Sequence, residues 1–167
     1  YIYNKLTGLF ESIRIGEEEI LDRPMELNLW RAPTDNDKRI KLQWLKARYD
    51  QSYAKAYDTS WKLDGANIYI HSTMAVTAPV VQPVLKIDTE WIIAPDGDIQ
   101  MKMYVKKDME FPMLPRFGLR MFLKRSFDQV TYYGIGPDES YIDKRRAGTH
   151  GIFTSSVASM NEDYIRP

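Results

Sequence analysis

Residues 28–37 read Asn-Leu-Trp-Arg-Ala-Pro-Thr-Asp-Asn-Asp, and this stretch decides the fold prediction because it marks the end of a strand. Pro33 has no amide hydrogen and disfavours helical geometry at Ala32, so the apolar strand before it should stop there. The polar residues at 34–37 are types whose side chains bond to nearby backbone amides in tight turns and helix caps. The sequence therefore predicts a strand that carries Arg31 and a rigid acidic turn to one edge of a sheet.

Two interpretations of the acidic turn are open from residue types alone. In the first, it is a turn and helix cap, with Asn36 and Asp37 capping a helix that begins at Lys38. In the second, it is a polar loop at the rim of a sugar-binding or catalytic cleft. In either case we predict that Arg31 pairs with Asp35 or Asp37 and fixes the turn, with direct contact to a substrate as the alternative.

One good helical candidate follows, over residues 39–54. Ile40, Trp44 and Ala47 share one helical face, and neither proline nor glycine interrupts the stretch. We therefore predict a single helix there, in a chain otherwise made of strands.

Short strands and turns fill most of the remaining chain. Residues 84–94 and 99–105 alternate apolar and polar positions on either side of the hairpin signal at 95–98, and a second hairpin turn is predicted at Asp64-Gly65. Many strands at roughly ten-residue spacing, with one helix, predict an all-β fold, a large antiparallel β-sandwich in a single domain. Four aromatic side chains follow the strand pattern and are mostly expected in the core: Trp61, Trp91, Tyr132 and Tyr133.

The composition limits the classes of function. With 44% hydrophobic residues among 167, the chain can bury a sizeable core, and 23 basic against 23 acidic residues give a net charge of zero. This balance does not point to nucleic acid or an anionic membrane as the main partner, and the apolar runs are far shorter than the ~20 residues of a membrane-spanning helix. The absence of cysteine excludes disulfides and thiolate chemistry and fits a cytoplasmic location.

The chemistry-bearing side chains predict no catalytic residue and no metal site. The two histidines lack metal-ligand spacing, and we expect His71 in a strand and His150 in a loop. A retaining glycosidase needs two carboxyl groups roughly 5–5.5 Å apart across the scissile bond. Carboxylates at i and i+2 of a turn, such as Asp35 and Asp37, rarely converge in this way, so they are predicted to be turn or capping residues.

Four stretches together resemble one known family. Residues 27–37 are similar to the signature of the C-terminal domain of large bacterial β-galactosidases, the lacZ type of glycoside hydrolase family two. Residues 114–120, Leu-Pro-Arg-Phe-Gly-Leu-Arg, resemble that family's Leu-Pro-Arg-x-Gly strand. Residues 132–144 resemble its Gly-x-Gly-Pro-x-Glu-Asn-Tyr segment, and residues 163–167 resemble its Tyr-Ile-x-Pro motif.

The resemblance implies a galactose-mutarotase-like supersandwich, present here as an incomplete piece of the last domain of a retaining β-galactosidase. Such enzymes hydrolyse terminal β-D-galactosides such as lactose, with two glutamates on a barrel domain upstream, so this chain alone should be inactive. The implied partners are the enzyme's other domains, further copies in a homo-oligomer, and the carbohydrate substrate. The family's Mg and Na ions are bound largely by other domains, which implies no cofactor in this chain.

The same resemblance gives roles to particular residues. Arg116 should satisfy a carboxylate inside the sandwich, with Glu139 as its candidate partner. The residues implied at the active-site rim are Asp35, Asn36, Asp37, Lys38 and Arg39, and the structural residues of the motifs are Trp30, Arg31, Pro33, Arg116 and Glu139.

Two other functions stay open. The chain could be a free-standing carbohydrate-binding β-sandwich, which would need exposed aromatic side chains. It could also be a mutarotase-like enzyme that uses His150 or His71 as acid and base with a carboxylate partner. We further expect an open sheet edge, which would pair with another edge or cause self-association.

Overall fold

The computed structural model describes residues 1–138 and 146–160. These residues fall into two units, Tyr1–Phe122 and Leu123–Pro167. Each unit contains antiparallel strand pairs of its own. The single-domain organisation stays a prediction.

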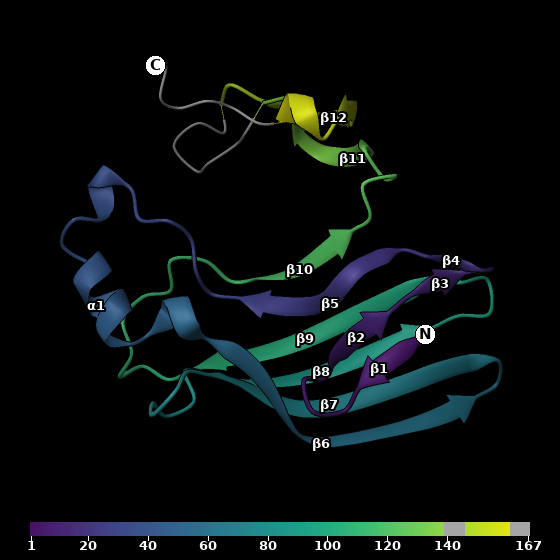
Figure 1. Cartoon of the computed structure of the whole chain (residues 1–167), viewed down its shortest axis with the longest axis horizontal. Helices are drawn as coiled ribbons and strands as arrows, with labels where there is room; N and C mark the ends of the chain where they lie inside the picture. The colour runs from purple at the N-terminus through teal and green to yellow at the C-terminus, as the bar shows by residue number, and fades with distance from the viewer. Residues whose placement is uncertain (139–145, 161–167) are drawn as a thin grey trace. The chain divides into compact units, whose positions relative to one another are not determined.

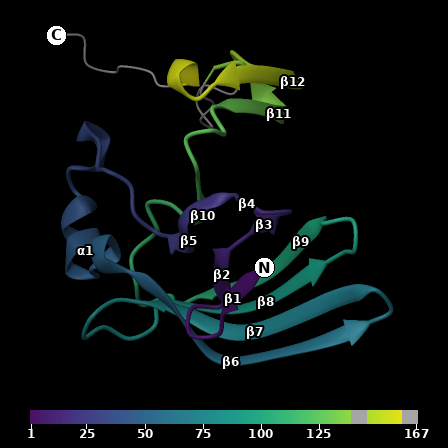
Figure 2. The same cartoon turned by 45° about the vertical axis from the view of Figure 1, so that its right-hand side comes forward.

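The first unit is built on a four-stranded antiparallel sheet in the order β6-β7-β8-β9 (Figures 1 and 2). Tight turns that contain Gly65 and Gly97 join β6 to β7 and β8 to β9, and φ at these glycines is 62° and 95°. Both hairpins are therefore confirmed where the sequence predicts them. The strands are β6 (Tyr53–Asp64), β7 (Asn67–Thr77), β8 (Leu85–Ile93) and β9 (Ile99–Lys107).

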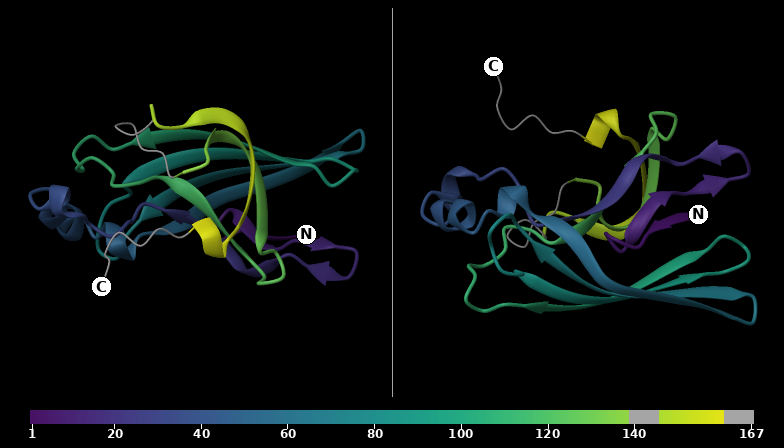
Figure 3. Two further views of the ribbon diagram at one scale, coloured as in Figure 1. Left: turned by 90° about the horizontal axis from the view of Figure 1, so that it is seen from above. Right: turned by 60° about the horizontal axis from the view of Figure 1, so that its bottom comes forward.

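A second layer of shorter strands packs against one face of this sheet (Figure 3). The rings of Phe10 and Trp91 meet edge to face with centroids 4.9 Å apart, and this contact joins the two layers. The predicted antiparallel β-sandwich is confirmed. The second layer contains the pair β1 (Ile2–Asn4) and β2 (Leu9–Ser12), the ribbon β3 (Arg14–Ile15) and β4 (Glu18–Glu19), and the pair β5 (Leu21–Asn28) and β10 (Gly118–Leu123).

The core lies between the layers because successive strand residues point to opposite faces. In β8, exposed Lys86 and Asp88 alternate with the buried side chains Leu85, Ile87, Thr89, Trp91 and Ile93. This alternation is the one that the sequence predicts for residues 84–94.

The predicted helix over residues 39–54 is present only in its first part. Helix α1 spans Lys41–Lys46, and Arg48 then adopts left-handed geometry with φ 55°. A 3₁₀ turn, η2 (Tyr49–Gln51), leads directly into β6. The prediction is wrong beyond Ala47 because pairing of residues 53–56 with β7 overrides their helical pattern.

The expected burial of the aromatic side chains holds only in part. Trp91 is buried and Tyr132 is half-buried, whereas Trp61 and Tyr133 are exposed. Trp61 lies on β6, the last strand at one edge of the four-stranded sheet, where strand periodicity does not guarantee a covering neighbour.

The second unit contains an antiparallel pair, β11 (Gln129–Gly136) and β12 (Thr149–Ser156), followed by the 3₁₀ turn η3 (Ala158–Met160). The rings of Tyr132 and Phe153 pack with centroids 5.5 Å apart on one face of this pair. His150 lies in β12 and not in the expected loop, because it pairs with Ile135. Within the described part of the chain, no helix is long and apolar enough to cross a membrane.

Candidate functional site

The candidate site is the corner that follows β5, defined as residues 29–40. The Asn28 side chain closes its start: its Nδ2 donates to the Trp30 carbonyl at 2.8 Å, and the Trp30 amide donates to its Oδ1 at 3.1 Å. The Asn28 side chain thus bonds to the backbone carbonyl and amide of Trp30, which lies just beyond the end of β5. The strand therefore stops before Pro33, as the sequence predicts.

Arg31 and Asp37 hold the corner closed. The Arg31 guanidinium donates from Nη1 to Asp37 Oδ2 at 2.5 Å and from Nη2 to Oδ1 at 3.0 Å, which is the two-pronged geometry that arginine forms with carboxylates. Thr34 adds two bonds to the same Oδ2, from its amide at 2.7 Å and from its Oγ1 at 3.0 Å. Of the two predicted partners, Arg31 therefore pairs with Asp37.

The electrostatics make Asp37 a permanent anion. Hydrogen bonding from Arg31 holds the pKa of the Asp37 carboxyl far below its usual value, and the bonds from Thr34 lower this pKa further. The Asp35 side chain is almost fully exposed and lies 3.8 Å from Lys38 Nζ. Because Asp37 is committed to Arg31 and Asp35 points into solvent, the two carboxylates do not form an acid/base pair.

Asp37 does not cap the helix as predicted. It is the last residue of a 3₁₀ turn, η1 (Asp35–Asp37), whose N-cap residue is Thr34. Its two oxygens are occupied by Arg31 and Thr34, so it closes its own turn instead. Helix α1 begins later, after Ile40, which provides no side-chain cap.

A second set of bonds ties the corner, α1 and η2 to the loop between β9 and β10, residues 108–117. Arg31 Nε donates to the Pro115 carbonyl at 3.2 Å, and Trp44 Nε1 donates to the Met113 carbonyl at 2.8 Å. The Tyr49 hydroxyl donates to the Pro112 carbonyl at 2.8 Å. These side chains satisfy loop carbonyls that lie outside any strand ladder.

Burial supports this arrangement. Trp44 and Tyr49 are among the largest fully buried side chains of the chain. Burial also raises the pKa of the Tyr49 hydroxyl to about 12, so it remains a neutral donor at physiological pH. At the end of β9, Lys107 Nζ donates to the carbonyls of Asp108 at 2.8 Å and Phe111 at 2.6 Å. Lys107 of β9 therefore holds the loop in addition to Trp44 and Tyr49.

A cleft of about 600 Å³ opens beside the corner. Arg120 at its wall lies 3.8 Å from Glu26, whereas Arg116 is exposed and has no carboxylate partner among the described residues. Arg116 is thus exposed and not inside the sandwich, and its predicted pairing with Glu139 stays a prediction. The cleft is lined by Glu26, Leu27, Asn28, Trp30, Arg31, Ala32, Tyr49, Asp50, Ser52, Arg116 and Arg120.

The predicted rim residues are brought together by this geometry, except that Asp37 is buried beneath them. Asp35, Asn36, Lys38 and Arg39 are all exposed on the turn. Glu139, predicted as the partner of Arg116, lies outside the described residues.

Sequence reasoning missed several residues that build the site, chiefly Trp44, Tyr49 and Lys107. A signal for them exists in Phe-Pro-Met-Leu-Pro at 111–115, because prolines leave a segment with carbonyls but few amides. Such a segment needs side-chain donors from elsewhere. The sequence does not identify Trp44 and Tyr49 as the donors, because each lies 63 or more residues away from the carbonyl that it binds.

The whole chain, residues 1–167, matches the family model described as beta galactosidase small chain. The chain belongs to the β-galactosidase small-chain family. It is 34% identical over 167 residues to a β-galactosidase of Actinobacillus pleuropneumoniae and 33% identical over 167 residues to one of Staphylococcus xylosus. The chain spans only 17% of the length of these two curated relatives, although all of it is covered in both comparisons.

Among the described residues, no group of three or more His, Asp or Glu side chains could hold a metal ion. His71 lies on the exposed face of β7 and His150 on β12, and neither has a hydrogen-bonded carboxylate within the described part of the chain.

Proposed function

We propose that this chain is a non-catalytic part of a retaining, lacZ-type β-galactosidase that shapes the rim of the active site. Hydrolysis of terminal β-D-galactosides would be carried out by two glutamates in another domain. Support comes from the family match over the whole chain and from relatives that are named β-galactosidases. The other domains, and further copies in a homo-oligomer, would be its partners.

One observation carries this proposal: Arg31 binds the Asp37 carboxylate and the Pro115 carbonyl at the same time. This joins the base of the turn to the loop before β10, while the turn's other polar side chains stay exposed. A residue that positions substrate needs such a fixed base, because small displacements of a binding group lower the rate strongly. Asp35, Asn36, Lys38 and Arg39 are then the groups available to sugar hydroxyls.

The chemistry of the corner fits a supporting role better than an acid/base role. A general acid must hold a proton near neutral pH, and the low pKa of Asp37 prevents this. A retaining glycosidase also needs carboxyl groups roughly 5–5.5 Å apart and facing each other. Mg and Na ions, where the enzyme uses them, would be held mainly by other domains, and the location would be cytoplasmic.

The test uses the complete β-galactosidase that carries this chain. Replacing Lys38 or Arg39 by alanine should change kcat/KM by about 3- to 10-fold, and the change should differ between substrates with different leaving groups. Lys102→Ala is a matched control, because Lys102 is also an exposed lysine but lies on β9. Constants within about twofold of the parent for both rim variants would overturn the proposal.

A second candidate is carbohydrate binding by the chain itself, favoured by the 600 Å³ cleft with Trp30 and three arginines in its wall. Aromatic rings and planar guanidinium groups are suited to sugar faces and hydroxyls. Titration calorimetry of the 167-residue chain with galactose, compared with an Arg116→Ala variant, tests it. Heat that saturates and is lost in the variant would support this function, whereas no heat at millimolar galactose would exclude it.

A further inference from the structure

One side of the sandwich exposes apolar residues that belong to its core face. Strand β6 carries a register shift between Ala56 and Asp58, which turns Thr59, Trp61 and Leu63 toward the core side. The Thr59 hydroxyl lies 2.9 Å from the buried Ser72 hydroxyl, which confirms the direction of this face. The core pattern of β7 and β8 therefore continues onto β6.

The covering layer stops before it reaches these residues. Trp61 is directly opposite Ile70 in the sheet, yet Trp61 is 64% exposed and Ile70 only 8%. Leu63, opposite Ile68, is also 64% exposed. Large apolar side chains left open on a core face normally mark a contact surface, since burying them removes apolar area from water.

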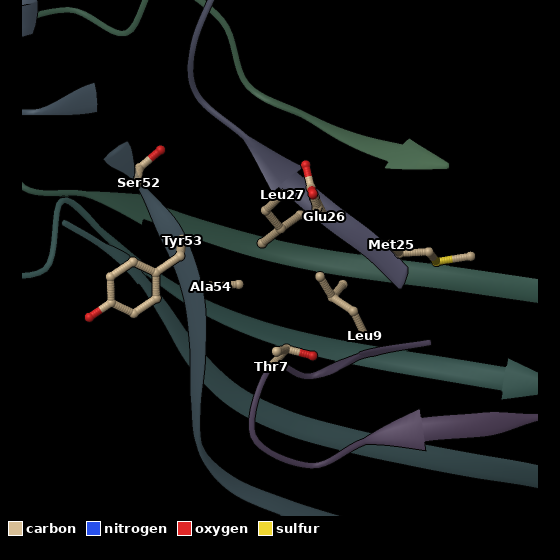
Figure 4. Close-up of a pocket in the computed structure, with 8 residues that line it drawn as sticks. All are labelled: Thr7, Leu9, Met25, Glu26, Leu27, Ser52, Tyr53 and Ala54. Carbon is tan, nitrogen blue, oxygen red and sulfur yellow. The ribbon is translucent and has the colours of Figure 1, made fainter. Parts of the chain in front are cut away.

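The other end of β6 borders a cavity of about 260 Å³ (Figure 4). Its walls include the core residues Leu9 and Leu27 together with Ala54 of β6. Between this cavity and Trp61, the exposed Leu6 lies against the strand, because its carbonyl accepts a 2.7 Å bond from the Ala56 amide.

We name this surface the β6 flank and define it by Leu6, Ala54, Trp61 and Leu63. The reverse face of the same sheet differs from it clearly. There, Lys102 lies 3.6 Å from Glu90, and the Thr73 hydroxyl donates to Asp88 at 3.0 Å, which is the pattern of a solvated face. The reverse face also exposes Tyr53 and Tyr104, but charged and polar side chains share that face with them, whereas Trp61 and Leu63 continue the core pattern.

We propose that the β6 flank receives an extended segment from the remainder of the longer β-galactosidase polypeptide, which adds a strand to β6. The inference rests on the proposed function in that this chain is taken to be part of a longer protein. The curated relatives are long enough to supply such a segment, because this chain spans only 17% of their length. A segment of the same polypeptide also has a high effective concentration at the flank.

The geometry defines what the segment must look like. It would run beside the part of β6 that follows Tyr57, because the outward amide of Ala56 already donates to the Leu6 carbonyl. This part of β6 pairs with β7 on one side and with no described strand on the other. Backbone bonds would satisfy its outward amides and carbonyls, which are otherwise a template for aggregation. Apolar residues at alternate positions would cover Trp61 and Leu63.

Hydrogen exchange in the complete enzyme tests the proposal. The amides of β6 that follow Tyr57 and point away from β7 should exchange at least about tenfold more slowly than the exposed amides of the turns at Gly65 and Gly97. Fast exchange of these β6 amides would overturn the proposal. So would protection that disappears when the oligomer is diluted to monomers, because a second copy would then be the occupant.

Substitution gives a second readout. Trp61→Lys should lower the melting temperature of the complete enzyme by several degrees and speed exchange along β6. Tyr104→Lys is the matched control, because Tyr104 is 73% exposed on the reverse face of β9. Equal effects of the two variants would count against the proposal. The exchange measurement on the unaltered enzyme decides the matter if Trp61→Lys does not fold.

The two proposals can fail separately. Fast β6 exchange in an enzyme whose rim variants change kcat/KM would leave the proposed function standing and remove the β6 contact. Slow β6 exchange in a protein without β-galactosidase activity would do the reverse.

Discussion

Arg31 and Asp37 form a closed ion pair in which both carboxylate oxygens accept from the guanidinium, at 2.5 and 3.0 Å. The pair is six residues apart in sequence, and it fixes the whole corner because Arg31 also reaches the Pro115 carbonyl. The corner is therefore a structural unit whose outer polar side chains are available for other contacts.

The fork geometry of Arg31 can be tested by a conservative change. Arg31→Lys keeps the charge but cannot make two parallel bonds to Asp37 and a third to Pro115. We expect the melting temperature of the chain to fall by several degrees, measured by circular dichroism. Lys102→Arg at an exposed site is the control and should leave it unchanged. An unaltered melting temperature in Arg31→Lys would mean that the corner does not depend on the fork.

The indole of Trp44 gives a prediction about the loop between β9 and β10. Trp44→Phe keeps a ring in the core but leaves the Met113 carbonyl without its donor. Losing this part-buried hydrogen bond should cost about 0.5–1.5 kcal/mol, which should appear as a lower midpoint in urea unfolding. Amides near Met113 should also exchange faster. Trp61→Phe, at an exposed tryptophan, should show neither effect, and similar shifts in both variants would contradict the assignment.

The hydrogen bonds to Glu19 predict how the stability of the fold changes at low pH. The Ser12 hydroxyl, the amides of Ile13 and Leu21, and Arg14 all donate to its carboxylate, and they lower the pKa of Glu19 to about 2 against burial, which raises it. Because the pKa of Glu19 is lower in the folded chain, its carboxylate stabilises the fold at pH values above 4.5, the ordinary pKa that it has in the unfolded chain. This contribution is lost as pH falls toward 2.

The measurement is the urea midpoint of the chain between pH 5 and pH 2.5, a range chosen to span most of that shift. Glu19→Gln should show a weaker loss of stability over this range than the parent chain. Glu18→Gln, in the adjacent position, is the control and should follow the parent. Identical profiles for the parent and Glu19→Gln would show that the Glu19 contacts do not stabilise the fold.

Tyr49 predicts a loss of stability as pH rises, which is the opposite pH dependence to that of Glu19. Burial raises the pKa of Tyr49 to about 12, so its contribution to stability is present below the ordinary value of 10.0 and is lost as pH rises toward 12. Burial also raises the pKa of Tyr3, so ultraviolet difference titration should show two tyrosines fewer ionising near pH 10 than an unfolded control predicts. Tyr49→Phe should remove one late-titrating signal, and loss of a signal near pH 10 instead would contradict the burial of Tyr49.

Much of this corner is predictable because it depends on local chemistry. Pro33 ends the strand, and the Arg31 partner is one of two carboxylates within six residues. The strands are predictable for the same reason, since alternation in β8 needs no knowledge of distant residues. The sequence thus indicates the sandwich and the closed turn.

What escaped prediction depends on contacts that are remote in sequence. Helix α1 ends early because Arg48 adopts left-handed geometry and β6 then pairs with β7. Two donors to the loop carbonyls, Trp44 and Tyr49, lie more than 60 residues away from the carbonyls that they bind. Trp61 is exposed although its register places it on the core face, because burial there depends on what covers the strand.

The most direct test of the account is a double-mutant cycle between Arg31→Lys and Lys38→Ala in the complete β-galactosidase, read as kcat/KM. If Arg31 positions the rim through Asp37, the two changes act on one unit, and the double variant should lose little more than the worse single variant. If the losses multiply independently, or if both single variants stay within about twofold of the parent, the corner does not shape the active site.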